Sequence, residues 1–172
     1  MTRVLLALAL LLAAPAMAGA QACRLDFTVR VTQGVGAIAP GDMLAGHASY
    51  TPLGRSFRQE GGSTAHLAQG EMTLGDGIRG PIWTLIVTSR GPSADLVGVY
   101  AREVEGLTVA GVAFEGPMAL TLFGPPGSRP DPAPPTTQAG WDRLDLRRAF
   151  SLHAQGADML AGDVTALQVA CG

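Results

Sequence analysis

The chain contains two cysteines, Cys23 and Cys171, and they lie near opposite ends of the sequence. A disulfide requires the Cα atoms of its two cysteines to lie within about 7 Å of each other. Such bonds persist in the periplasm and outside the cell, whereas two free, buried thiols are the alternative for this pair. We predict a Cys23–Cys171 disulfide, which would place the first and last segments of the fold side by side.

Residues 1–22 have the composition of a bacterial export signal. A positively charged start is followed by the apolar run Val4–Ala14 and then by small residues in Ala-x-Ala steps. The run is too short for a membrane-spanning helix, which needs about 20 residues, although an uncleaved anchor is the other interpretation. We therefore predict a signal peptide and a periplasmic or secreted protein, with cleavage after Ala22 or, alternatively, after Ala18 or Ala20.

The predicted mature chain, residues 23–172, has the size of one domain with its own hydrophobic core. Loss of Arg3 with the leader leaves 11 arginines against 14 carboxylates, a net charge of −3. Proteins that bind nucleic acid are usually basic, so this charge argues against a nucleic-acid partner. Every later apolar segment is interrupted by Gly, Pro or charge, so we expect no membrane span in the mature chain.

Short apolar segments separated by Gly and Pro indicate strands. In residues 24–32 apolar and polar side chains alternate strictly, which is typical of a half-buried strand. Ile82–Thr88 is a continuous apolar run and predicts a central strand buried on both faces. The other strand candidates are residues 44–50, 96–104, 107–114, 118–123, 150–154 and 164–170.

This spacing predicts an all-β fold, either an antiparallel β-sandwich or a flattened barrel of about eight or nine strands. Residues 124–140 contain six prolines and are expected to form a long loop, and residues 141–148 a short helical turn. The sequence Asp-Met-Leu-Ala-Gly occurs at 42–46 and again at 158–162. We interpret the two copies as equivalent strand starts.

The segments around these copies also carry a family resemblance. Pro40-Gly-Asp42, Gly46 and Tyr50, together with the ending Phe150-Ser-Leu152 and Gly162–Thr165, resemble exported bacterial β-sandwich domains found with Pro-Glu-Pro (PEP-CTERM) sorting tails. The resemblance implies the fold and no particular activity. The chain has no Pro-Glu-Pro tail, so surface sorting is not implied.

Residues that could bind a metal or act in catalysis are dispersed along the sequence. His47, His66 and His153 lie on separate candidate segments without the spacing of metal ligands, and we expect no metal and no cofactor. The stretch 61–66 superficially resembles a nucleophile elbow but lacks the following helix and the second glycine. The acid pairs Glu103/Glu105 and Asp142/Asp145 are explained by solvated positions, so we assign no catalytic residue. Aromatic residues are few and scattered, which argues against a platform for sugars.

We therefore expect an exported, non-enzymatic accessory or binding domain whose partner is an unknown protein or small molecule. The alternatives are a small hydrolase and a lipocalin-like carrier of an apolar ligand. A filled core favours the accessory domain, a cleft with converging His and Asp the enzyme, and an internal pocket the carrier. Binding residues concentrate in loops, and Arg beside an aromatic side chain is frequent at contacts. We expect loops at residues 51–63 and 124–141, and they supply the candidates Arg55, Phe57, Arg58 and Trp141. The alternative is that Phe57 and Trp141 only cap the core.

Overall fold

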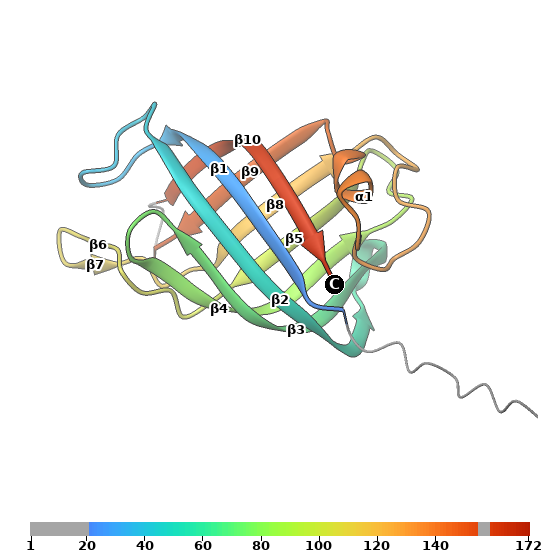
Figure 1. The fold of residues 1–172 in the computed structure, drawn as a ribbon. Helices are drawn as coiled ribbons and strands as arrows, with labels where there is room; N and C mark the ends of the chain where they lie inside the picture. Colours follow the sequence, from blue (N-terminus) through green and yellow to red (C-terminus); the bar gives the residue numbers. More distant parts are fainter. Residues whose placement is uncertain (1–20, 155–158) are drawn as a thin grey trace, which may run out of the picture.

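Eight antiparallel strands close into one barrel (Figure 1). The structure is a computed structural model, and it describes residues 21–154 and 159–172. The predicted signal peptide therefore lies almost wholly outside the described residues. The barrel strands are β1 (Cys23–Gln33), β2 (Met43–Arg58), β3 (Ser63–Leu74), β4 (Ile78–Thr88), β5 (Asp95–Ala101), β8 (Met118–Gly124), β9 (Arg147–His153) and β10 (Met159–Cys171).

The order around the barrel is β1-β10-β9-β8-β5-β4-β3-β2, and β2 returns to β1. The first and last strands are therefore neighbours. Cys23 lies directly opposite Cys171, their Cα atoms are 4.1 Å apart, and the two residues form a disulfide. The predictions of an all-β fold and of a Cys23–Cys171 disulfide are confirmed. Of the two architectures considered, sandwich and barrel, the structure is a closed barrel.

Several predicted boundaries are wrong. Residues 51–63 were expected to form a loop, but β2 continues to Arg58 and β3, which was not predicted, begins at Ser63. An irregular register between Pro52 and Ser56, with Gly54 at φ +69°, breaks the alternation that would have indicated a strand. Residues 107–114 form the short hairpin β6 (Thr108–Val109) and β7 (Val112–Ala113) instead of one strand, and the helical turn α1 (Gln138–Asp142) begins earlier than expected.

Apolar side chains fill the interior of the barrel. Each barrel strand contributes inward residues with little or no exposed surface, and these belong to one continuous cluster. The β6–β7 hairpin and α1 lie at opposite ends (Figure 1), and both regions contribute side chains to the same cluster. The largest of the fully buried side chains are Trp141, Phe114, Phe150, Leu25, Met72, Leu74, Leu85, Met118, Leu120, Leu122, Leu144 and Leu152.

The proline-rich segment between β8 and α1 is held against the barrel by Asp95, the first residue of β5. This carboxylate is completely buried. It accepts hydrogen bonds from the backbone N–H groups of Gly91 at 2.8 Å and Arg129 at 2.6 Å, and from the Ser128 hydroxyl at 3.4 Å. A buried carboxylate is stable only when hydrogen bonds replace its water, so these bonds fix the loop to the end of β5.

Candidate functional site

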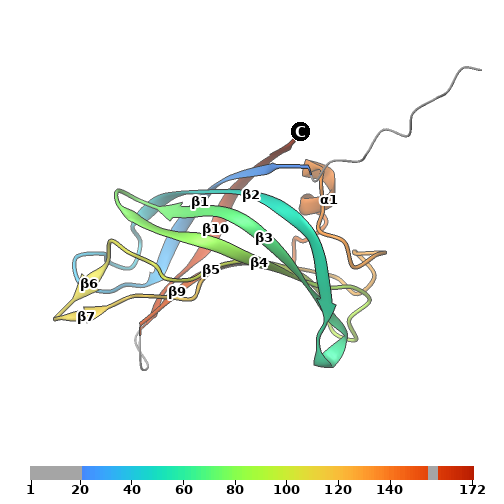
Figure 2. The same ribbon diagram turned by 90° about the horizontal axis from the view of Figure 1, so that it is seen from below.

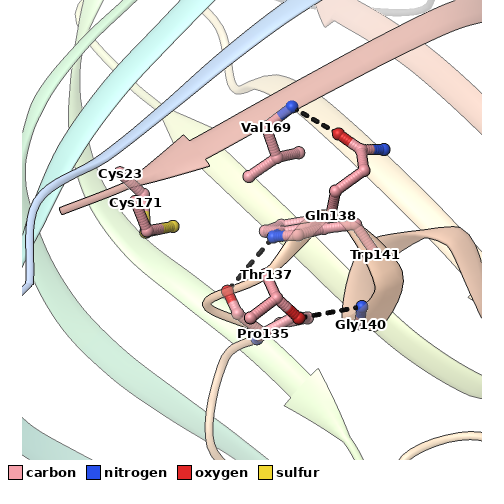
Figure 3. The surroundings of a disulfide bond; sticks show 8 residues. All are labelled: Cys23, Pro135, Thr137, Gln138, Gly140, Trp141, Val169 and Cys171. Atoms are coloured by element: carbon pink, nitrogen blue, oxygen red, sulfur yellow. Dashed lines mark hydrogen bonds between the residues drawn. A yellow bond between two sulfur atoms is a disulfide. The ribbon is translucent and has the colours of Figure 1, made fainter.

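Trp141, predicted as a contact residue, belongs to the core. Its side chain is 0 % exposed, and its indole N–H donates to the carbonyl oxygen of Pro135 at 3.1 Å (Figure 3). The Thr137 side chain caps α1 by accepting from the Gly140 N–H at 3.2 Å, which holds the tryptophan in this position. Trp141 closes one end of the barrel and is not available to a partner.

Gln138, also on α1, pairs with the free edge of β10. β9 covers β10 only from Met159 to Asp163, which leaves the last part of β10 without a strand on that side. There the Val169 N–H donates to Gln138 Oε1 at 2.6 Å (Figure 3). Gln138 Nε2 also donates to the Leu167 carbonyl at 3.3 Å. The side-chain amide therefore satisfies backbone groups that a neighbouring strand would otherwise satisfy.

The other three predicted contact residues, Arg55, Phe57 and Arg58, are exposed on the outer part of β2. Phe57 is 50 % exposed and lies opposite Ala65, whereas Arg58 lies opposite Thr64. Neighbouring residues of a strand point to opposite faces, so Arg58 and Phe57 do not share a surface. The structure does not bring the four predicted residues together.

The histidines and acids form one notable pair, on the outer wall of β1 and β2. His47 Nδ1 is 2.9 Å from Asp26 Oδ1, and Arg24 Nε donates to Asp26 Oδ2 at 3.0 Å. The Arg24 hydrogen bond, assisted by His47, lowers the pKa of Asp26, whose side chain is 47 % exposed. Within residues 21–154 and 159–172, no group of three or more His, Cys, Asp or Glu side chains could hold a metal ion. The acid pairs considered above are also exposed.

The most unusual surface lies on the outer side of the other six barrel strands, and we call it the neutral face. It consists of outward positions on strands β3, β4, β5, β8, β9 and β10 that stand directly opposite one another in three cross-strand rows. Such partners project from the same face of a sheet. The rows are Ser63-Thr88-Leu96-Phe123, Ala65-Ile86-Gly98-Thr121-Ala149 and Leu67-Thr84-Tyr100-Ala119-Ser151-Ala161.

Tyr100 is the only ionisable side chain among these positions, and charged residues occur only where the rows end, at Arg147 and Asp163. The wall formed by β1 and β2 instead carries Arg24, Asp26 and Arg30. Every residue of the neutral face is buried or half-buried although it points away from the core.

Part of the neutral face is hollowed. A hollow of about 380 Å³ lies over β5, β8, β9 and β10, and strands β5, β8 and β9 lie at the back of the barrel in Figure 1. Phe57 stands at the start of the middle row, where β2 bends toward the turn that joins it to β3 (Figure 2). The residues that line the hollow are Thr32, Leu96, Tyr100, Thr121, Phe123, Arg147, Ala149, Phe150, Ser151, Met159, Ala161, Gly162 and Asp163.

The Tyr100 ring lies down along the sheet because residue 98 is glycine. A Cβ atom at position 98 would lie 2.4 Å from Tyr100 Cε2 and 2.7 Å from its hydroxyl oxygen. A glycine within a strand often marks a place where another group approaches the backbone closely. Here the aromatic ring occupies that space and forms part of the floor of the hollow. Sequence reasoning missed this aromatic site, although the regular alternation of Leu96, Gly98 and Tyr100 was visible.

Two further hollows are less suited to a ligand. One, of about 760 Å³, contains Trp83, which is 41 % exposed, but the Arg102 guanidinium lies over its ring at 5.4 Å. Arg102 also pairs with Glu103 at 3.5 Å, so the groups of this hollow already engage one another. The other, of about 730 Å³, surrounds the disulfide and is lined by residues of β1, β2, β3 and β10, among them the charged Arg24.

No protein-family model, curated protein or solved structure matches the chain. The resemblance to exported β-sandwich domains therefore stays a prediction. Among the helices in the described residues, none has the length and apolar character needed to cross a membrane. The candidate site rests on the geometry of the neutral face.

Proposed function

We propose that this chain is an exported, non-enzymatic binding domain that takes its ligand in the hollow of the neutral face. The observation that carries the proposal is the contrast between the two walls. Arg24, Asp26 and Arg30 lie on the outer side of β1, whereas the three rows of the neutral face carry no charged residue between their ends and contain a hollow. Concave sites of a few hundred Å³ with apolar lining and a few polar groups are typical of ligand binding.

The alternatives receive less support. A carrier of the lipocalin type needs an internal cavity, but here the inward side chains of the eight strands form one packed cluster. A hydrolase needs an acid or base beside a place for its substrate. Within the described residues His47 pairs with Asp26, and neither residue lines the hollow.

The proposal is tested by mapping where small neutral molecules bind. Phenol, cyclohexanol and isopropanol are titrated to about 10 mM or above, because ligands of this size bind with millimolar affinity at best. The isotope-labelled exported protein is followed by nuclear magnetic resonance. We expect the shift changes to concentrate at Leu96, Tyr100 and Thr121. Changes that concentrate at Trp83, or no changes at all, would contradict the proposal.

A matched pair of variants checks the location. Thr121→Arg places a long charged side chain in the middle of the neutral face, and Thr73→Arg makes the same change on β3 opposite His47, outside the hollow. Both threonines are half-buried outward residues. Thr121→Arg should abolish the shift changes and Thr73→Arg should preserve them. Equal effects of the two variants would show that the probes bind elsewhere.

A further inference from the structure

We propose that the hollow of the neutral face binds a neutral carbohydrate and that Tyr100 is its stacking surface. This inference rests on the proposed function, because it names the ligand class of the same site. It also reverses our interpretation of the aromatic residues as too scattered for sugars. Tyr100 and Phe123 are distant in sequence, yet both line the hollow because β5 pairs with β8.

The charges around the hollow favour a neutral ligand. Asp163 is the acidic group at its edge, and its carboxylate already accepts a hydrogen bond from Arg30 at 3.1 Å. Arg147 is the exposed basic group at the rim, and it faces no second arginine or lysine in the lining. An ionic ligand would lose its hydration and find little opposite charge in return, which disfavours anions and cations alike.

The lining also alternates apolar and hydroxyl groups. Leu96 and Phe123 supply apolar surface, while Thr121 and Ser151 supply hydroxyl groups from the neighbouring rows. A lipid chain or an apolar helix would displace the water that hydrogen-bonds these hydroxyl groups and would offer no hydrogen bond in return. Each hydroxyl group left unsatisfied in this way costs about 1–3 kcal/mol of binding free energy. A sugar ring has apolar C–H faces and hydroxyl edges, so it matches both kinds of group at once.

Tyr100 provides the geometry that a sugar ring requires. Because the side chain lies along the sheet over Gly98, its ring lines the hollow and does not project from the sheet. An aromatic ring presents a weakly negative face, which attracts the slightly positive C–H groups of a pyranose. Its cross-strand neighbours Ala119 and Thr84 are small and buried, whereas Tyr100 itself lines the hollow.

A second copy of the chain is a poorer occupant. A two-fold dimer places the same patch of each subunit against itself. Two hollowed surfaces cannot fill each other, and protein interfaces require close complementarity of shape. A carbohydrate chain is narrow enough to enter the hollow of about 380 Å³.

The inference is tested by titrating the exported protein with neutral tetrasaccharides based on glucose and on N-acetylglucosamine, in both α- and β-linked forms. Binding is measured by nuclear magnetic resonance shifts. We expect at least one tetrasaccharide to bind with shift changes at Leu96, Tyr100 and Thr121. Tyr100→Ala should weaken that binding by about tenfold or more, as expected for loss of an aromatic contact, whereas Tyr100→Phe should retain most of it.

Gly98→Ala examines the orientation of the ring, because the new methyl group must displace Tyr100. It should weaken saccharide binding even though no group that touches the sugar has been removed. Trp83→Ala is the control: it removes an exposed aromatic side chain from the adjacent strand, outside the hollow. Trp83→Ala should leave saccharide affinity within about twofold, and the thermal midpoint of each variant shows whether it is folded.

The outcomes separate the inference from the proposed function. If phenol and cyclohexanol bind in the hollow but no tetrasaccharide does, the carbohydrate inference is overturned and the binding domain stands. If neither class binds there, both fail. Saccharide binding that depends on Trp83 and not on Tyr100 overturns the inference as well.

Discussion

Gly46 and Gly162 lie on either side of β1, and each makes room for a side chain of that strand. A Cβ atom at position 46 would lie 2.1 Å from Cε2 of Phe27, and one at position 162 would lie 2.4 Å from Cγ1 of Val29. Both glycines end a copy of the repeated Asp-Met-Leu-Ala-Gly sequence. The interpretation of these copies as equivalent strand starts is confirmed, because β2 and β10 begin within them and both pair with β1.

This relationship predicts that Gly46→Ala and Gly162→Ala are both destabilising. The added methyl group must displace the Phe27 ring in the first variant, and in the second it also meets the Arg30 carbonyl oxygen, 2.5 Å away. Overpacking of this kind costs about 1–3 kcal/mol of unfolding free energy. Urea denaturation measures the cost. Ala45→Ser, at an exposed neighbouring position, should change stability by no more than about 0.5 kcal/mol; a similar loss in all three variants would contradict the packing explanation.

Reduction of the disulfide should lower the thermal midpoint. The bond joins residues separated by 148 positions, and in the chain-entropy account a loop of this length contributes about 4–5 kcal/mol. Cys23→Ser combined with Cys171→Ser should reproduce the effect of a reducing agent. The measurement is thermal unfolding with and without that agent, and the double variant should then be insensitive to it. If the reducing agent left the thermal midpoint of the wild-type protein unchanged, backbone pairing between β1 and β10 would be sufficient to hold the two strands together.

Gln138 should be needed as a hydrogen-bonding group at the edge of β10. Gln138→Ala leaves the Val169 N–H and the Leu167 carbonyl without their partner, and we expect a loss of about 1–3 kcal/mol. Gln138→Glu can still accept from Val169 but cannot donate to Leu167, so its loss should be intermediate. Amide hydrogen exchange at Val169 should accelerate most in the alanine variant. Equal stability of the two variants would indicate that only the donated bond matters.

Tyr50→Phe should stabilise the protein at neutral pH and more strongly at alkaline pH. The Tyr50 hydroxyl is buried, and no hydrogen-bond partner for it lies among the described residues, so its removal should gain up to about 1 kcal/mol. Burial also raises the pKa of Tyr50. The unfolded chain then releases this proton at lower pH than the folded one, so the wild-type protein loses stability above about pH 10.

The difference between the two proteins should therefore grow by about 1.4 kcal/mol for each pH unit above that point. Denaturant unfolding between pH 7 and pH 11 measures it. Parallel stability curves for wild type and Tyr50→Phe would refute the assignment of the alkaline loss to this residue.

A chelator should leave the thermal midpoint unchanged. His47 pairs with Asp26, and His66 Nε2 lies 2.7 Å from the Pro132 carbonyl oxygen, so both imidazoles already have protein partners. A structural metal would contribute much of the folding free energy. The test is thermal unfolding with and without a chelator, and a fall of about 10 °C or more would sink the prediction.

The local alternation of apolar and polar residues was sufficient to locate some strands in the sequence and not others. Strict alternation located β1 to within one residue at each end, and the apolar run Ile82–Thr88 located the buried half of β4. The run also predicted burial on both faces, and this is wrong for the outer side, where Trp83 is exposed and Ile86 and Thr88 are half-buried. β3 was missed because its register shifts between Leu67 and Gly70, which interrupts the alternation that identifies a strand.

The placement of the proline-rich loop and of the predicted contact residue Trp141 depends on contacts that no local pattern encodes. Asp95 binds Arg129 across the barrel end, and Trp141 turns inward because Pro135 accepts its indole N–H. Whether a loop aromatic is a contact residue or part of the core depends on where the loop docks. That docking is set by partners distant in sequence.

The sequence by itself determined the strand character of the chain, the joining of its ends through Cys23 and Cys171, and the absence of charge on the outward positions of β5 and β8. These properties depend on residue type and on a period of two, both of which can be read locally. Only the tertiary structure decided that β5 pairs with β8, that the barrel closes between β1 and β10, and that Tyr100 and Phe123 meet in one hollow. Register and closure arise from packing between segments far apart in the chain, so the surface they create exists only after folding.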